Sequence, residues 1–238
     1  MRPFHCLPID PNTQAYYRFG ERQSLLADQS GNGRSLTAYG APTLCQQGGQ
    51  FVRASGQYLA RASAYSLSAV GMATLECWCR LDTLPASAEY YGLCGQNYNL
   101  RMAIRGITGA PTYQLLVSYE QSSGGTQNVI VAWASLAAAT WYHVAATLVP
   151  NDRLYVFING VLVDSSSTTA DLLFKYASAE LLVGDFQPTG HYFNGVIDEV
   201  RLSSAARYTA AFAPRRYAEG RRGVARGPGL EILAGVAA

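Results

Sequence analysis

The sequence contains few charged residues, a single lysine and cysteines in no recognisable pattern. Charged residues make up 14% of the 238 residues and hydrophobic residues 49%, so the chain can bury a large core and is not expected to be disordered. The five cysteines lack the spacing of a metal site, and their odd number argues against a disulfide framework. No stretch approaches the ~18 apolar residues of a membrane helix, and the opening stretch MRPFHCLPIDPN lacks the apolar core of a signal peptide. We therefore expect no membrane insertion and a chain that folds in the cytoplasm.

Positive charge is concentrated near the C-terminus. Residues 215–238 contain five arginines and two glutamates, whereas residues 1–214 contain 13 basic and 14 acidic residues. Nucleic-acid binding needs a basic face with interleaved aromatic residues, and a short segment rich in Gly and Arg does not supply one. We therefore predict no nucleic-acid partner, and we interpret residues 215–238 as an extension that docks on a neighbouring chain or frays.

Alternating apolar stretches separated by turns dominate the remaining sequence. Asn159-Gly160 lies between two such stretches and predicts a tight hairpin, because both turn positions need a positive φ. The stretches recur every 8–12 residues, and no amphipathic helix of useful length interrupts them. This pattern predicts an all-β fold with two antiparallel sheets packed as a sandwich. The expected strands are 74–81, 113–120, 128–136, 141–149, 153–158, 161–165, 180–186 and 196–202.

The order of the motifs resembles the laminin-G-like, concanavalin A-like jelly-roll family. The motifs that carry this resemblance are LADQSGNGRSLTAYG (26–40), FVRASGQYLAR (51–61), TLECWCRLDTLP (74–85), WYHVAATLVPNDRLYVFINGVLVDS (141–165) and YFNGVIDEVRLSSAARYT (192–209). The resemblance implies a jelly-roll domain over residues 10–214. Residues 1–9 and the Arg/Gly-rich residues 215–238 are then N- and C-terminal extensions.

The stretch FNGVIDEVRL (193–202) contains two adjacent acids within a predicted strand. If the strand alternates with period two, Asp198 shares a buried face with Val196, Val200 and Leu202, and Glu199 forms a solvated pair with Arg201. Glycoside hydrolases place two carboxylates around one bond, ~5–9.5 Å apart, which adjacent strand residues on opposite faces cannot do. No G-x-S-x-G motif is present either. We therefore predict no catalytic residues and a non-enzymatic protein.

The buried carboxylate of Asp198 needs a partner, for which the sequence offers two alternatives. Many relatives in the family hold a structural calcium ion between the loop that corresponds to ADQSGNGRS (27–35) and the last strand. The resemblance therefore implies Asp28, Asn32 and Asp198 as ligands here and Ca²⁺ as the cofactor. In the other alternative Asp28 and Ser30 cap a turn, and Asp198 accepts hydrogen bonds from backbone amides. Arg53 and Gln57 stand where many relatives carry acids, which favours the second alternative.

Two predicted loops combine aromatic rings with amide and imidazole groups, as sugar-binding sites do. One loop covers residues 88–101 and the other residues 187–195. Sixteen tyrosines in one chain also suit an interaction surface, because tyrosine supplies contact area at low entropic cost. The candidate ligand-binding residues are Tyr90, Tyr91, Asn97, Tyr98, Asn99, His191 and Tyr192.

The stretch SSAARYTAAFAP (203–214) resembles the ending of such domains in bacteriophage structural and tail proteins. This resemblance implies a virion protein, tail-associated or decorating the capsid, that is made in the host cytoplasm. The expected partners are other virion proteins, with host cell-surface glycans and further copies of this chain as additional candidates. The alternatives are a free-standing carbohydrate-binding lectin and, less favoured, a glycoside hydrolase.

Overall fold

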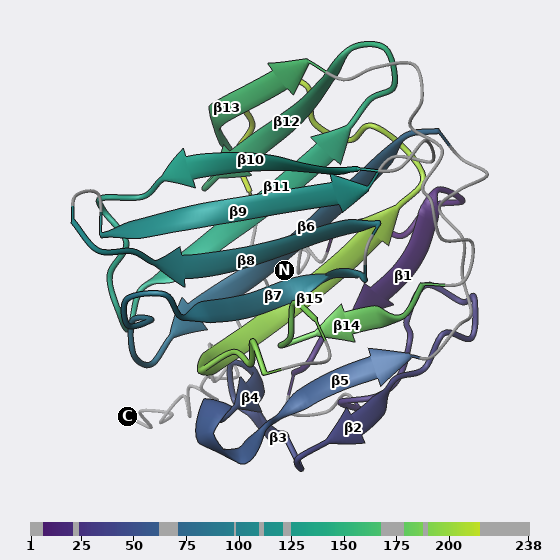
Figure 1. Cartoon of the computed structure of the whole chain (residues 1–238). Coiled ribbons are helices and arrows are strands. Elements are labelled where there is room, and N and C mark those ends of the chain that lie inside the picture. Colours follow the sequence, from purple (N-terminus) through teal and green to yellow (C-terminus); the bar gives the residue numbers. More distant parts are fainter. Residues whose placement is uncertain are drawn as a thin grey trace, which may run out of the picture.

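The computed structural model describes residues 7–20, 24–61, 71–97, 99–109, 112–120, 125–167, 179–187 and 190–214. Within these residues the chain forms two antiparallel β-sheets packed face to face (Figure 1). The predicted all-β sandwich of the jelly-roll type is therefore confirmed. Among the described residues, no helix has the length and apolar character needed to cross a membrane. The predicted extension 215–238 lies outside the described residues.

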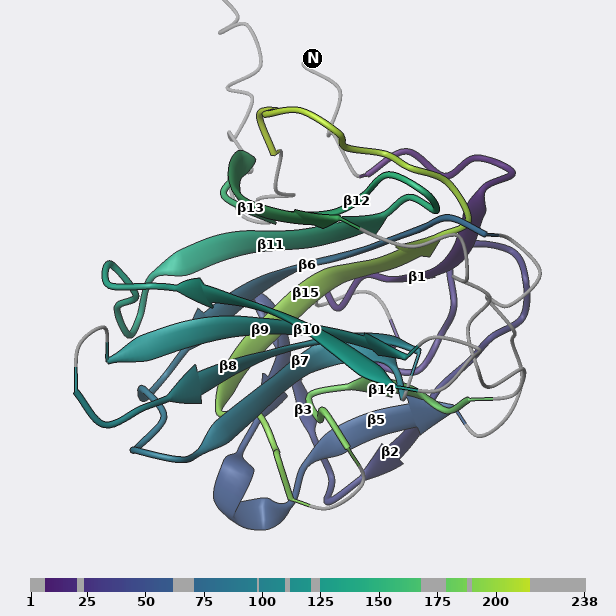
Figure 2. The ribbon, with the colours of Figure 1, turned by 45° about the horizontal axis from the view of Figure 1, so that its top comes forward.

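Sheet A has eight strands and sheet B has seven, and the order of neighbours differs from the order along the chain. Successive strands often belong to different sheets, so the chain crosses repeatedly between the two. The sheets appear as two layers in Figure 2. Sheet A runs β13 (Val161–Ser167), β12 (Arg153–Ile158), β11 (Trp141–Leu148), β6 (Ala73–Leu81), β15 (Gly195–Ser203), β4 (Gly48–Phe51) and β3 (Thr43–Cys45), and β1 (Thr13–Tyr17) also pairs with β15. Sheet B runs β10 (Thr126–Ala132), β9 (Tyr113–Glu120), β8 (Leu100–Gly106), β7 (Tyr90–Gln96), β14 (Leu181–Val183), β5 (Tyr58–Arg61) and β2 (Thr37–Tyr39). A short 3₁₀ turn, η1 (Arg53–Ser55), precedes β5.

The alternation predicted for the central strands is confirmed. In β6, Leu75, Cys77 and Cys79 point into the core between the sheets, and the residues between them lie on the outer face of sheet A. The predicted hairpin is also present, since β12 and β13 are joined by Asn159 and Gly160 with φ values of 51° and 74°. Both turn residues have the positive φ that this hairpin type requires.

The strand β15 departs from the predicted alternation at a β-bulge. Its register against β6 shifts between Asp198 and Arg201, and Glu199 has a φ of 49°. Ile197 faces the core before the bulge, and Val200 and Leu202 face it afterwards. The prediction that Val196, Asp198, Val200 and Leu202 share one face was therefore wrong, because the extra residue reverses the phase of the strand.

The predicted solvated pair of Glu199 and Arg201 was also wrong. Glu199 is 0% exposed, and Arg201 is buried on the outer face of sheet A. There its Nε donates to Oε1 of Glu76 at 2.8 Å. His143 Nε2 lies 3.0 Å from the other oxygen of Glu76, to which the hydroxyl of Tyr208 donates at 2.9 Å.

The segment after β15 covers this buried group. Residues 204–214 pass over the outer side of sheet A (Figure 2), and the backbone N–H of Phe212 donates to the carbonyl of Gly160 at 2.9 Å. The rings of Tyr208 and Phe212 are stacked with centroids 3.6 Å apart. The motif SSAARYTAAFAP therefore closes the outer face of sheet A and excludes water from Glu76.

Burial by itself would raise the pKa of Glu76, but the hydrogen bond with His143 and the charge of Arg201 outweigh it. The pKa of Glu76 therefore lies below its ordinary value. The stabilisation that results is fully present above the ordinary carboxyl pKa, and it is lost as the pH falls through the lower pKa of the folded state.

Replacing Glu76 by glutamine is expected to lower the free energy of unfolding by about 3–5 kcal/mol, because Arg201 then keeps a buried charge without a carboxylate. Urea unfolding at neutral pH measures this difference. The control is Asp82→Asn, which breaks the partly exposed pair of Arg80 and Asp82 and is expected to cost less than about 1 kcal/mol. Equal losses in both variants would contradict the special role of Glu76.

Candidate ligand-binding face

The outer face of sheet B carries polar and aromatic side chains in register. On β8, Leu100, Met102 and Ile104 point into the core, so Arg101 and Arg105 point outwards. Cross-strand pairing sets Arg101 opposite Ser118, Ala103 opposite Leu116, and Arg105 opposite both Gln114 and Tyr90. The rigid sheet therefore fixes the spacing of these groups.

A loop lies across the middle of this face. We call it the cover loop; it comprises residues 184–187 and 190–193. It crosses the sheet at Gly92, where a Cβ atom would lie 2.1 Å from the carbonyl carbon of Asp185 and from the nitrogen of Phe186. The N–H of Gly92 also donates to the carbonyl of His191 at 2.7 Å. Glycine at position 92 is therefore what lets the loop backbone rest directly on the sheet.

Two side chains fasten the cover loop to the sheet. Phe186 packs against Ala103 and Leu116, and the guanidinium carbon of Arg101 lies 4.5 Å from the centroid of the Phe186 ring, a cation–π contact. Nη1 of Arg101 also donates to Oδ1 of Asn97 at 3.1 Å. Arg101 is only 5% exposed, so it holds the loop in place rather than reaching into solvent.

Asp185 shapes the start of the cover loop. Its Oδ1 accepts hydrogen bonds from the backbone N–H groups of Phe186 at 2.7 Å and Gln187 at 3.3 Å. The side chain is 1% exposed, and burial raises the pKa of Asp185 to about 6 against the lowering effect of these bonds. Asp185 is therefore a turn-forming residue that lies beneath the surface.

Four partly exposed side chains form what we call the Tyr90 cluster: Tyr90, His191, Arg105 and Gln114. The rings of Tyr90 and His191 meet edge to face with centroids 5.2 Å apart. Arg105 donates from Nη1 to the hydroxyl of Tyr90 at 3.3 Å and from Nε to Oε1 of Gln114 at 2.7 Å. Burial, together with the charges of Arg53 and Arg101, lowers the pKa of His191, so its imidazole is neutral at neutral pH.

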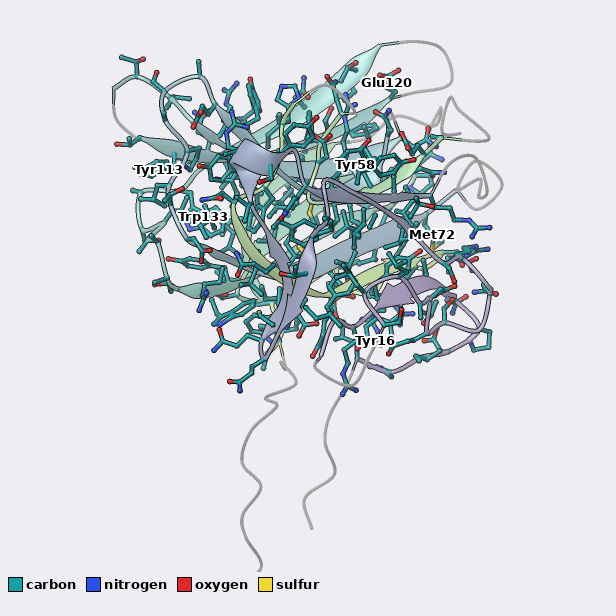
Figure 3. All side chains as sticks on the ribbon, turned by 90° about the horizontal axis from the view of Figure 1, so that it is seen from below. Tyr16, Tyr58, Met72, Tyr113, Glu120 and Trp133 are labelled. Carbon is teal, nitrogen blue, oxygen red and sulfur yellow. The ribbon has the colours of Figure 1, made fainter. Side chains whose placement is uncertain are left out.

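Three stacked tyrosines form a second group on the same face, which we call the tyrosine ladder. Tyr39 and Tyr58 lie directly opposite each other on β2 and β5, with ring centroids 4.6 Å apart and planes within 6°. Tyr192, from the cover loop, continues the stack at 5.8 Å from Tyr58. In Figure 3, Tyr58 lies on the sheet B side of the molecule, whereas Tyr16 of β1 lies on the sheet A side.

A family model described as the concanavalin A-like lectin/glucanases superfamily matches residues 53–211, more than half of the chain. The chain belongs to this superfamily. The resemblance identified in the sequence motifs is thereby confirmed. A comparison with curated protein sequences gives no match.

Three solved structures share this fold with the chain at low sequence identity. Domain 4 of an extracellular arabinanase from Geobacillus stearothermophilus, in complex with arabinotriose, is 20% identical with a TM-score of 0.59, covering 82% of this chain and 93% of that chain. The receptor binding domain of the botulinum neurotoxin C/D mosaic serotype is 14% identical with a TM-score of 0.63, covering 83% and 49%. The binding domain of botulinum neurotoxin DC in complex with SialylT is 14% identical with a TM-score of 0.61, covering 84% and 49%. This chain therefore spans about half the length of the toxin chains, and the likeness is one of fold.

The structure separates the ligand residues predicted from the sequence. Tyr90 and His191 come together in the Tyr90 cluster, Tyr192 enters the tyrosine ladder, and Asn97 supports Arg101. Tyr91 and Asn99 are buried: the Tyr91 ring packs edge to face on Phe193, and Asn99 donates to Gln96. Tyr98 lies outside the described residues. The sequence reasoning missed Arg105, Gln114, Tyr39 and Tyr58, which only the strand register brings to this face.

The predicted calcium ligands lie on the other side of the molecule, near β1 and β15. Asp28 accepts four hydrogen bonds, from the N–H groups of Tyr16, Ser30 and Arg34 and from the hydroxyl of Ser30, at 2.8–3.1 Å. Four bonds use the acceptor capacity of a carboxylate, so a calcium ion at Asp28 would have to displace some of these donors. The Nδ2 group of Asn32 donates to the carbonyl of Thr13 at 2.9 Å.

Asp198 is held in a comparable way. Its Oδ1 accepts hydrogen bonds from the N–H groups of Phe19 at 2.9 Å and Glu199 at 2.8 Å. Among the described residues, no group of three or more His, Cys, Asp or Glu side chains is arranged to hold a metal ion. These contacts are the ones expected in the alternative in which the carboxylates bind backbone amides, and the calcium site stays a prediction.

Chelator and Asp28→Asn distinguish the two alternatives. The backbone contacts predict that EDTA leaves the melting temperature unchanged. Asp28→Asn should lower the free energy of unfolding by about 1–3 kcal/mol, because partly buried N–H groups lose one of their acceptor oxygens. Thermal unfolding with and without EDTA measures both effects. A melting temperature that falls with EDTA, recovers with added Ca²⁺ and loses this response in Asp28→Asn would instead establish the calcium site.

Proposed function

We propose that this chain is a non-enzymatic carbohydrate-binding module and that the outer face of sheet B is its ligand surface. The observation that carries the proposal is the Tyr90 cluster. There a tyrosine ring and a neutral imidazole meet a guanidinium and an amide, all partly exposed and held by a rigid sheet.

The chemistry of the cluster matches that of a sugar. A pyranose has an apolar C–H face, which packs against aromatic rings, and hydroxyl groups that donate and accept hydrogen bonds. The amide nitrogen of Gln114 can donate while its oxygen accepts from Arg105. Nδ1 of His191 is buried, which leaves Nε2 as the imidazole atom for a ligand. Arg105 adds donors in a fixed plane. Because strands and a fastened loop hold these groups, little conformational entropy is lost on binding.

The relatives support the same class of ligand. The arabinanase domain was solved with arabinotriose and one toxin binding domain with SialylT. Those ligands belong to those proteins, and at 20% and 14% identity their sites cannot be transferred residue by residue. They support a glycan as the class to test first.

Three buried carboxylates, Asp185, Glu76 and Asp198, fit binding better than hydrolysis. A glycosidase needs two carboxyl groups that reach the substrate. Asp185 has the raised pKa of a general acid, but it is buried beneath the cover loop and engaged by backbone amides. Glu76 and Asp198 are buried in sheet A, on the far side of the core from this face.

Saturable binding on a glycan array is expected for the wild-type protein, and Tyr90→Ala or Arg105→Ala should weaken it at least about tenfold, because each removes a direct contact. The control is Tyr155→Ala, which removes a partly exposed tyrosine from β12 in sheet A and should leave binding unchanged.

Two results would overturn the proposal. An array without any bound glycan, from folded protein, would remove the binding function. Release of reducing sugars from a polysaccharide panel by the wild-type protein would replace it with a glycosidase.

We further propose that the module works as a bacteriophage virion component, tail-associated or on the capsid surface, in contact with sibling proteins. The support is the resemblance of residues 203–214 to the ending of such domains in phage structural proteins. In a phage that encodes this chain, mass spectrometry of purified particles is expected to detect its peptides. Their absence from particles, alongside their presence in the infected-cell lysate, would contradict the virion role.

A further inference from the structure

We propose that the tyrosine ladder is a second subsite of the sheet B face, and that its ligand is an oligosaccharide long enough to span the ladder and the Tyr90 cluster. This inference rests on the proposed carbohydrate-binding function and adds the length of the ligand.

The two groups lie on the same face of one continuous sheet. Pairing runs from β2 to β5, β14, β7 and β8 without a break, and four inter-strand spacings amount to about 19 Å. The cover loop joins the groups directly, since His191 belongs to the Tyr90 cluster and the next residue, Tyr192, belongs to the ladder. A single sugar ring cannot reach both ends of this surface, whereas a short chain of sugars can.

The ladder presents aromatic surface to solvent. Tyr39 is 41% exposed, and Tyr58 and Tyr192 are partly exposed. Tyr39 forms one end of the three-ring stack and lies on the edge strand β2. Exposed aromatic surface of this kind suits the apolar side of a pyranose ring.

A structural explanation of the ladder must be separated from the binding one. Cross-strand aromatic pairs stabilise the edge of a sheet, so Tyr39 could serve β2 alone. If Tyr39 only stabilises the sheet edge, replacing it changes the free energy of unfolding and affects the affinity for all oligosaccharides equally. If Tyr39 belongs to a subsite, replacing it lowers the affinity for long oligosaccharides only.

The experiment measures dissociation constants by isothermal titration calorimetry for gluco-, xylo-, galacto- and arabino-oligosaccharides of one to six units. For the series that binds the wild-type protein, we expect affinity to rise roughly tenfold or more between the shortest and the longest members. Tyr39→Ala and Tyr39→Leu should abolish this rise and leave the affinity for the shortest bound member unchanged. Tyr39→Phe, which keeps the ring, should retain it. Tyr155→Ala is the matched control on sheet A.

Each outcome decides between the claims. If Tyr39→Leu, folded by circular dichroism, binds every length as the wild type does, the subsite is refuted and the proposed function stands. If no oligosaccharide binds the wild type, the proposed function and the subsite both fall.

Discussion

The buried carboxylate of Glu76 is the contact on which the arrangement of sheet A depends. It lies on β6, at the centre of the sheet, and it binds Arg201 of β15, His143 of β11 and Tyr208 of the closing segment. A charge in this position is tolerated only when its partners are in place. The order of three neighbouring strands and the path of residues 204–214 are therefore fixed together. The bulge at Glu199 is needed for this contact, because it turns Val200 and Leu202 into the core and leaves Arg201 facing Glu76.

Sheet B is organised by close backbone approach rather than by charge. Gly92 lets the cover loop rest on the sheet, and Phe186 and Arg101 then hold it there. The buried residues of this face hold the cover loop in position, and the partly exposed residues carry the aromatic and polar groups that reach solvent. The division explains why Arg101 and Asp185, which look like ligand-binding residues by type, act as supports, whereas Tyr90, His191 and Arg105 reach solvent.

Much of the fold could be predicted from local patterns. The alternation in TLECWCRL and the Asn159-Gly160 turn both depend on neighbouring residues, and both were read correctly. The bulge was missed because the residue with positive φ is Glu199, a residue type that gives no such signal. Tyr90 and Tyr91 are adjacent, so period two separates them, but only the strand boundaries reveal which one faces the core. The pairing of Tyr39 with Tyr58, and of both with Tyr192, depends on sheet register between distant segments, which no local pattern encodes.

The contact at Gly92 has a consequence for how this face can be redesigned. The sheet beneath the cover loop offers a fixed seat, made of a glycine, a small side chain at Ala103 and an apolar side chain at Leu116. A loop of different sequence can occupy the same position if its backbone contacts Gly92 and one aromatic side chain packs on Ala103 and Leu116, as Phe186 does. The cover-loop side chains can therefore be exchanged by grafting, while Tyr90, Arg105 and Gln114 on the strands, and the core beneath them, stay as they are. In engineering terms, the domain consists of a constant frame and one interchangeable part.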